Sequence, residues 1–142
     1  ENIVINDLIK ECTKGLEKNN NNIEINEKNI VQTSGRPIQL KRAFQNIIDN
    51  SKRYGNIIVI EIFTNNEGCN IEINDNGKGI PKDKYEDVFK PFFTLDPSRN
   101  KLKGESGLGL TITRDIIRSH GGEIKLDKSD LGGLKLQVLL PI

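Results

Sequence analysis

Apolar residues recur at helical spacing in three stretches of this 142-residue chain. Residues 3–16 and 37–53 each carry one apolar stripe and are predicted to form amphipathic helices. The third stretch runs from Gly104 to Gly122, and its stripe consists of Leu108, Ile112, Ile116 and Ile117. The opposite side of this helix is charged, with Arg114, Asp115 and Arg118. Glycines let a backbone approach a ligand, and the first turn of a helix has free N–H groups. The third stretch is therefore either a cradle for a phosphate or a plain glycine turn.

Shorter apolar runs predict β-strands. Residues 57–63 are almost all apolar, which is typical of a strand covered on both faces. Residues 69–75 alternate, so that one face holds Cys69, Ile71, Ile73 and Asp75. A turn at residues 65–68 joins these two strands into a hairpin. Further strands are predicted at residues 23–25, 30–32, 123–127 and 134–140, the last two forming a hairpin about Gly132-Gly133, and a short helix at residues 82–89.

The helix predicted at residues 37–53 carries a polar stripe beside its apolar one. The apolar stripe consists of Leu40, Ala43, Phe44, Ile47, Ile48 and Ser51. Asn46, Asn50 and Arg53 lie at i, i+4 and i+7 and border it, which places them at the edge of the core. The asparagines either bond to neighbouring backbone or supply oxygen ligands to a hard cation such as Mg²⁺. Arg53 is correspondingly a solvated charge or a contact for a phosphate.

Asp75 is in phase with the buried face of its predicted strand. A carboxylate in that position is costly unless it is paired or hydrogen-bonded. It opens a tight turn with the sequence Asp-Asn-Gly-Lys-Gly. Asp75 is therefore either a structural cap of this turn or an acceptor for a donor such as a purine amino group. In the second case Gly77 and Gly79 would let the ring lie against the backbone.

Three of the five phenylalanines lie at positions 89–93, just before a polar stretch. Phe89, Phe92 and Phe93 are expected to pack beneath a loop. Residues 94–106 carry several basic side chains and connect the phenylalanines to the glycine loop. They are predicted to form either a lid over a ligand or a plain connection.

Composition narrows the class of protein. With 21 basic and 20 acidic residues the formal net charge is +1, so nothing indicates a nucleic-acid surface. Cys12 and Cys69 are too few for a disulfide scaffold and lack metal-ligand spacing, which favours a reducing compartment. The single histidine, His120, argues against a histidine-rich metal site. No apolar run is long enough to span a membrane. The length fits one domain, and a chain that opens on Glu1 is expected to belong to a larger protein.

The order of these features resembles the catalytic, ATP-binding domain of two-component sensor histidine kinases. The resemblance rests on the asparagine helix, the Asp75 turn, the phenylalanines and the sequence Gly107-Leu108-Gly109-Leu110, and it covers at least residues 30–142. Residues 40–43 and 50–56 are similar to the osmosensor, or EnvZ-type, subgroup. The superfamily also includes DNA gyrase, the ninety-kilodalton heat-shock chaperone and the mismatch-repair ATPase. Its α/β fold is a two-layer sandwich of the Bergerat type, with a mixed, mostly antiparallel sheet, helices on one face and a flexible ATP lid, here residues 94–106. Residues 1–29 would supply an N-terminal helix and strand to a single domain of residues 1–142.

The resemblance also implies roles for individual residues. Asn50 would bind Mg²⁺ with help from Asn46, and Arg53 would contact the phosphates, which makes these three the residues implied in catalysis. Asp75 would accept a hydrogen bond from the adenine amino group. The other residues implied in ATP binding are Tyr54, Gly77, Gly79, Ile80, Phe89, Phe92, Gly107, Leu108, Gly109 and Leu110. Glu105 stands where the family often has glycine, so its side chain is expected to face solvent.

Position 46 bears on the reaction type. Members of the superfamily that hydrolyse ATP have a Glu there to activate water, and an amide is no base at neutral pH. The resemblance therefore implies a kinase that transfers the γ-phosphoryl group of ATP to histidine. An ATP-hydrolysing module of the gyrase or chaperone class and a degenerate nucleotide-binding adaptor are the alternatives.

The partners implied by the resemblance lie outside this chain. His120 is not expected to be the phosphoacceptor, because it closes a helix before two glycines. The acceptor is expected on a separate dimerisation domain of the same protein, with a response regulator as the second partner. The domain would lie on the cytoplasmic side of the bacterial inner membrane. It would reach the membrane only through segments absent from this sequence.

Overall fold

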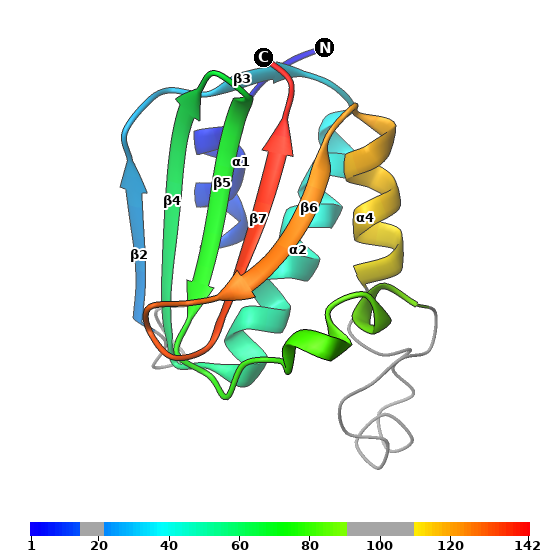
Figure 1. Cartoon of the computed structure of the whole chain (residues 1–142). Helices are drawn as coiled ribbons and strands as arrows, with labels where there is room; N and C mark the ends of the chain where they lie inside the picture. The colour runs from blue at the N-terminus through cyan, green and yellow to red at the C-terminus, as the bar shows by residue number, and fades with distance from the viewer. Residues whose placement is uncertain (15–21, 91–109) are drawn as a thin grey trace.

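The molecule has two layers, a five-stranded sheet and a group of helices packed against one of its faces (Figure 1). The structure is a computed structural model that describes residues 1–14, 22–90 and 110–142, except for the side chain of Tyr54. In chain order its elements are β1 (Asn2–Val4), α1 (Ile5–Cys12), β2 (Asn22–Glu27), β3 (Gln32–Ser34), α2 (Pro37–Tyr54), β4 (Ile57–Asn65), β5 (Gly68–Asp75), 3-10 turns at Lys82–Lys84 and Asp87–Phe89, α4 (Leu110–Ser119), β6 (Glu123–Lys128) and β7 (Leu134–Leu140). This arrangement confirms the α/β sandwich with helices on one face.

The strand order in the large sheet is β2-β4-β5-β7-β6. Only β2 and β4 run parallel, and the other three neighbouring pairs are antiparallel. The sheet is therefore mixed and mostly antiparallel, as the resemblance implies. A separate pair, β1 and β3, forms a small antiparallel sheet at the N-terminal end of the chain.

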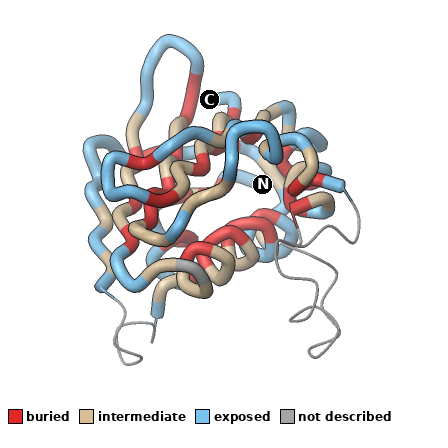
Figure 2. Tube along the Cα trace, turned by 60° about the horizontal axis from the view of Figure 1, so that its bottom comes forward, coloured by how far each residue is buried: buried red, intermediate tan, exposed pale blue. Residues whose placement is uncertain are grey.

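The hydrophobic core lies between the sheet and the helices. All six residues of the predicted apolar stripe on α2 are buried, which confirms that stripe. In β4 the side chains of Ile58, Ile60 and Ile62 have no exposed surface. Buried positions alternate with more exposed ones along the strands in Figure 2, because successive side chains point to opposite faces.

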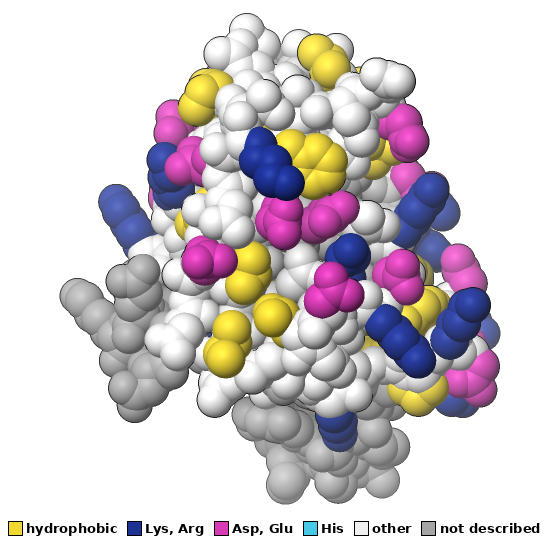
Figure 3. Space-filling model, turned by 60° about the vertical axis from the view of Figure 1, so that its left-hand side comes forward, with side chains coloured by type: hydrophobic (Ala, Val, Ile, Leu, Met, Phe, Trp, Pro, Cys, Tyr) yellow, Lys and Arg dark blue, Asp and Glu magenta, His cyan; other side chains and the backbone are white. Residues whose placement is uncertain are grey.

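The outer face of the sheet has no helix over it, so the expectation that β4 is covered on both faces is wrong. Val59, Glu61 and Phe63 point outward and are only half-buried. Figure 3 shows charged side chains of both signs among apolar ones over the edge of the sheet at β2 and beside it. The ammonium group of Lys28 lies over the ring of Phe63, 5.5 Å from its centre, and forms an ion pair with Glu61 Oε2 at 3.4 Å.

Several element boundaries differ from the sequence prediction. The first helix begins at Ile5 because Asn2–Val4 pairs with β3 as a strand. The strand expected at residues 30–32 lies at Gln32–Ser34 instead, and Ile30 is 68% exposed. The region 82–89 contains two short 3-10 turns and no continuous helix. The first helix also ends earlier than predicted, at Cys12 instead of near residue 16, and Gly15 lies outside the described residues.

The helix α4 presents a different face to the core than predicted. Ile116 and Ile117 are buried as expected, but Ile112 is 47% exposed and Thr113 is fully buried in its place. Thr113 faces α2, where its hydroxyl oxygen is 3.5 Å from Asn46 Nδ2. Arg114, expected on the charged outer side, covers an aromatic ring instead. The helix is thus turned so that a polar contact between helices replaces one apolar contact.

Candidate functional site

The predicted site residues of the described chain gather at one end of the two layers. The C-terminal ends of α2 and β5 meet the N-terminal ends of α4 and β7 there, at the lower end of the molecule in Figure 1. The bond from Asn46 to Thr113 links α2 to α4. Gly55, just after α2, lies so close to β5 that a Cβ atom on it would be 3.1 Å from Asp75 Cβ. The fold thus brings together residues of the predicted site that are up to 64 positions apart, from Asn46 to Leu110.

The polar stripe on α2 lies at the border of the core, as predicted. Asn46, Asn50 and Arg53 are each half-buried. Asn46 donates through Nδ2 to Thr113 over a long 3.5 Å, and no described residue donates to its Oδ1. In the described part of the chain no group of three or more His, Cys, Asp or Glu side chains is placed to hold a metal ion. Amide oxygens such as these are ligands that Mg²⁺ accepts beside waters and phosphates, so the stripe fits the predicted metal role.

Asp75 is 3% exposed, which confirms its predicted place on the buried face. Its Oδ1 accepts hydrogen bonds from the backbone N–H groups of Gly77, at 2.9 Å, and Leu134, at 3.2 Å. No described residue donates to Oδ2. Every fully buried side-chain oxygen in the described residues has a partner, so Oδ2 keeps some contact with solvent although Asp75 as a whole is buried. The carboxylate therefore caps its turn with one oxygen and keeps the other as an acceptor.

The electrostatics of Asp75 follow from this position. Burial raises the pKa of Asp75 above its ordinary value, because a charge is poorly solvated there. The two backbone N–H groups act in the opposite direction and stabilise the ionised form, but burial is the larger effect. The site thus holds a carboxylate that is fixed in place, incompletely solvated and short of one donor.

The turn after Asp75 is fastened to the start of β4. Asn76 accepts hydrogen bonds through Oδ1 from the backbone N–H groups of Asn56 and Ile57, both at 3.0 Å. Gly79 has φ +72°, a conformation that glycine adopts readily, and its α-carbon faces the backbone of Gly133. The structure therefore shows a packing role for Gly79, and Gly77 provides one of the two donors to Asp75.

Sequence reasoning missed four residues that support the site: Thr113, Asn76, Gly133 and Leu134. Gly133 was recognised only as part of a turn, and nothing in the sequence connected that turn to Asp75. The connection arises because β7 pairs with β5, which places Leu134 beside Asp75 at the end of the ladder. The one signal for Thr113 in the sequence was a Thr among the isoleucines of this helix, and the structure shows that it is buried.

The three remaining described residues of the predicted site are apolar and at least half-buried. Phe89 is 5% exposed and Leu110 is 2% exposed, whereas Ile80 is half-buried against the core. The guanidinium of Arg114 lies 4.2 Å from the centre of the Phe89 ring and forms an ion pair with Glu86 at 3.2 Å. Phe89 thus packs beneath other groups, as expected of the phenylalanines.

Other predicted site residues lie outside the described part of the chain. They are Phe92, Gly107, Leu108 and Gly109, together with Glu105 and the predicted lid at residues 94–106. For Tyr54 the structure gives the helical backbone at the end of α2 but not the side chain. Their roles stay predictions.

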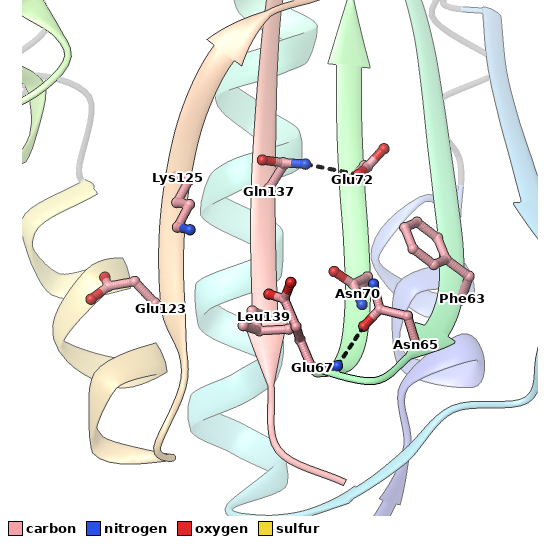
Figure 4. Close-up of a pocket in the computed structure, with 9 residues that line it drawn as sticks. All are labelled: Phe63, Asn65, Glu67, Asn70, Glu72, Glu123, Lys125, Gln137 and Leu139. Atoms are coloured by element: carbon pink, nitrogen blue, oxygen red, sulfur yellow. Dashed lines mark hydrogen bonds between the residues drawn. The ribbon is translucent and has the colours of Figure 1, made fainter.

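A hollow of about 260 Å³ lies elsewhere, on the outer face of the sheet. Its labelled side chains come from β4, β5, β6 and β7 and from the turn at Glu67, and Gln137 donates a hydrogen bond to Glu72 across its floor at 2.8 Å (Figure 4). None of the predicted site residues lines it. The hollow is therefore separate from the candidate site, which faces the helices.

The carboxylates nearest to the asparagine stripe in sequence do not face it. Asp49 accepts a hydrogen bond from Gln45 at 3.1 Å on another side of α2. Glu61 points to the outer face of the sheet, where it pairs with Lys28. Neither is placed to act as a base beside Asn46 or Asn50.

Comparison with known proteins identifies the family. Residues 35–142 match the family described as "Histidine kinase-, DNA gyrase B-, and HSP90-like ATPase", and the chain belongs to it. Its relatives include the sensor histidine kinase CpxA of Escherichia coli, 36% identical over 109 residues. The sensor protein VanS of Enterococcus faecium is 39% identical over 100 residues, and sporulation kinase C of Bacillus subtilis is 34% identical over 148 residues. These matches cover 76%, 68% and 97% of this chain, but only 24%, 26% and 33% of the relatives.

Solved structures agree with this membership. The mycobacterial sensor histidine kinase MprB has a TM-score of 0.86 at 24% identity, over 99% of this chain and 96% of that one, which shows the shared fold. The histidine kinase domain of the Escherichia coli osmosensor EnvZ has a TM-score of 0.74 at 27% identity, over 100% of this chain and 88% of that one. The recognition of a sensor-kinase ATP-binding domain is thereby confirmed. None of the helices in the described residues is both long and apolar enough to cross a membrane.

Proposed function

We propose that this chain is the catalytic domain of a sensor histidine kinase, which binds Mg²⁺ and ATP and donates the γ-phosphoryl group to a histidine on a separate domain. The observation that carries the proposal is Asp75, a buried carboxylate with Oδ1 fixed by two backbone donors and Oδ2 left for a ligand. An adenine amino group is a donor that fits this acceptor. Membership of an ATPase family supports nucleotide binding independently.

The asparagine stripe would serve the phosphate end of the nucleotide. Asn50, with Asn46 assisting, would supply oxygen ligands to Mg²⁺, and Arg53 would contact the phosphates. Bound Mg²⁺ would neutralise phosphate charge and hold the phosphates in one orientation. The backbone of residues 107–109 is the further phosphate contact implied by the resemblance.

A kinase fits the stripe better than an ATP-hydrolysing enzyme. Position 46 holds an amide whose Nδ2 already points to Thr113, and neither Asp49 nor Glu61 faces it. A water molecule beside the γ-phosphate would therefore find no base at position 46, 49 or 61, whereas a histidine brings its own lone pair. The hydrolysing module and the degenerate adaptor remain the competing functions, and the experiment below separates them.

His120 is poorly suited to be the phosphoacceptor. Its Nδ1 lies 2.8 Å from the carbonyl oxygen of Ile116, which can only accept, so Nδ1 carries the proton. Its Nε2 then accepts a hydrogen bond from the backbone N–H of Arg36 at 3.0 Å. Both ring nitrogens are thus engaged, and no lone pair is directed to solvent. The acceptor histidine belongs to another domain, for which the named sensor kinases among the relatives give support.

The biological setting follows from the same proposal. The parent protein would dimerise through its phosphoacceptor domain and pass the phosphoryl group to a response regulator. The present domain would lie on the cytoplasmic side of the bacterial inner membrane, attached through segments outside this sequence. Its match to only a quarter to a third of each relative's length is consistent with such a parent.

The test combines binding with two activity measurements. Calorimetric titration should show ATP binding that is stronger with Mg²⁺ than without it, and absence of ATP binding would refute the proposal. With γ-labelled ATP the chain alone should release no phosphate above background and carry no label on His120. Label should appear once the parent's histidine domain is added, and ATP binding with no label on that domain would support the nucleotide-binding adaptor. Steady ATP hydrolysis by the chain alone would support the gyrase- or chaperone-type function instead.

A further inference from the structure

We propose that Gly133 is a positioning residue for adenine recognition, because the turn between β6 and β7 fixes which oxygen of Asp75 faces the nucleotide. The inference rests on the proposed function, in which Asp75 accepts a hydrogen bond from adenine. Gly133 itself would touch neither the base nor the phosphates. It would act entirely through the carboxylate of Asp75.

The turn between β6 and β7 is fastened to the end of β5 by three hydrogen bonds. Ser129 Oγ donates to Asn74 Oδ1 at 2.9 Å, and both side chains are buried. The backbone N–H of Gly133 donates to the carbonyl oxygen of Asp75 at 3.2 Å. The backbone N–H of Leu134 donates to Asp75 Oδ1 at 3.2 Å. The turn thus holds both the backbone and the side chain of Asp75.

Position 133 has no room for a side chain. A Cβ atom on Gly133 would lie 2.1 Å from Asp75 Oδ1, 2.6 Å from Asp75 O and 2.6 Å from the backbone nitrogen of Gly77. All three atoms belong to the hydrogen-bonded turn of Asp75, so none can move without breaking a contact there. Even an alanine at this position would push the carboxylate away from its two donors.

Gly133 therefore determines which oxygen of Asp75 the protein holds and which oxygen is left for a ligand. Leu134 and Gly77 bond to Oδ1 only, which leaves Oδ2 without a described protein donor and not fully buried, as the acceptor available to a nucleotide. If the carboxylate rotates, the oxygen that meets the nucleotide is no longer in a fixed place, and the selectivity for an amino group over a carbonyl falls. The phosphate contacts on α2 are not touched by this change.

The neighbouring glycine offers a matched control. Gly132 adopts φ +103°, so alanine there strains the backbone, but a Cβ atom on it would meet nothing within 4 Å. Gly132→Ala thus perturbs the same turn and lowers the melting temperature without touching Asp75. A purely structural role of the turn would make both variants behave alike.

The experiment measures dissociation constants for Mg-ATP, Mg-GTP and Mg-tripolyphosphate by calorimetry, together with melting temperatures. Gly133→Ala should weaken ATP binding by about tenfold or more, which is the loss of one hydrogen bond, and should leave tripolyphosphate binding within about twofold. Gly132→Ala should keep the wild-type preference for ATP over GTP. In an Asp75→Asn background, Gly133→Ala should reduce that preference no further. Equal loss of preference in both glycine variants, or none in Gly133→Ala, would overturn the inference.

A second measurement keeps the inference testable if Gly133→Ala does not fold. In the wild-type chain the amide proton of Leu134 should change its NMR chemical shift as Asp75 titrates, and the amide of Leu131 in the same turn should not. A Leu134 amide that does not respond to Asp75 would overturn the inference without any variant. If the wild-type chain binds no ATP at all, the proposed function fails, whereas the NMR result still reports whether the turn holds Asp75.

Discussion

Replacing Asp75 with asparagine is expected to change nucleotide binding and stability in opposite directions. The amide is nearly the same size as the carboxylate, and its oxygen can take the place of Oδ1 between the N–H groups of Gly77 and Leu134. The amide nitrogen must then occupy the position of Oδ2. Where the wild type offers an acceptor to the ligand, Asp75→Asn offers a donor.

The magnitude of the binding loss follows from the hydrogen bonds. A bond to a charged group contributes about 1.5–3 kcal/mol, and an adenine amino group left facing another donor costs about 1–3 kcal/mol more. A total of about 3 kcal/mol corresponds to about a 100-fold weaker dissociation constant for ATP. GTP presents a carbonyl oxygen at the same place on its ring, so the preference for ATP over GTP should fall even further.

Although Asp75→Asn weakens ATP binding, it should not lower the free energy of unfolding at pH 7. Burial raises the pKa of Asp75, so the ionised carboxylate is less favourable in the folded chain than in the unfolded one. Its contribution to stability is fully present below the ordinary pKa of a carboxyl group and is lost as the pH rises through the raised folded value. At pH 7 the variant should therefore unfold with a free energy equal to or above that of the wild type. This difference should shrink as the pH falls through the raised pKa of the folded wild-type carboxyl toward the ordinary value.

Calorimetry with ATP and GTP and urea denaturation at pH 7, 5 and 4 check both statements. Asp130→Asn is the matched control, because it removes the same charge from an exposed side chain in the turn between β6 and β7. The reasoning about adenine is refuted if Asp75→Asn weakens ATP binding no more than Asp130→Asn does. The reasoning about burial is refuted if Asp75→Asn lowers the unfolding free energy at pH 7 while the difference stays constant with pH.

Three further outcomes are expected. Asn50→Ala should abolish the part of ATP affinity that depends on Mg²⁺ and preserve binding in the presence of a chelator, and calorimetry with and without Mg²⁺ would show a uniform loss if Asn50 has only a structural role. Phe44→Ala should lower the unfolding free energy by about 3–5 kcal/mol in urea denaturation, because the Phe44 side chain has no exposed surface, and a loss below about 1 kcal/mol would contradict its place in the core. Burial raises the pKa of Cys12 to about 11, so its thiol should react with an aromatic disulfide at pH 8 far more slowly in the native chain than in urea, and similar rates would contradict this burial.

The buried faces of α2 and β5 were predicted correctly from the spacing of residues within each element. Every residue of the apolar stripe on α2 is buried, and the polar stripe of Asn46, Asn50 and Arg53 lies at its border. The phase of Asp75 in β5 also placed it on the buried face. These predictions succeed because the periods of a helix and a strand are properties of the local backbone, so the spacing of residues determines which of them share a face.

Predictions failed where a partner element decides the outcome. Ile112 has the spacing of a buried residue, yet Thr113 is buried instead, because α4 meets the amide of Asn46 on α2. Ile3 and Val4 were expected in the first helix, but they belong to a strand that pairs with β3. The apolar run of β4 did not show that only one face of the sheet is covered by helices.

The sequence by itself therefore determined the family, the order of the motifs and the faces on which Asn46, Asn50 and Asp75 lie. Only the tertiary structure decided that the turn at Gly133 and Leu134 belongs to the site, because these residues reach Asp75 through the pairing of β5 with β7, 59 positions away along the chain. It also decided that one oxygen of Asp75 is held by the protein and the other is open. The physical reason is that hydrogen bonds and close contacts depend on distances between elements, whereas a sequence pattern describes one element at a time.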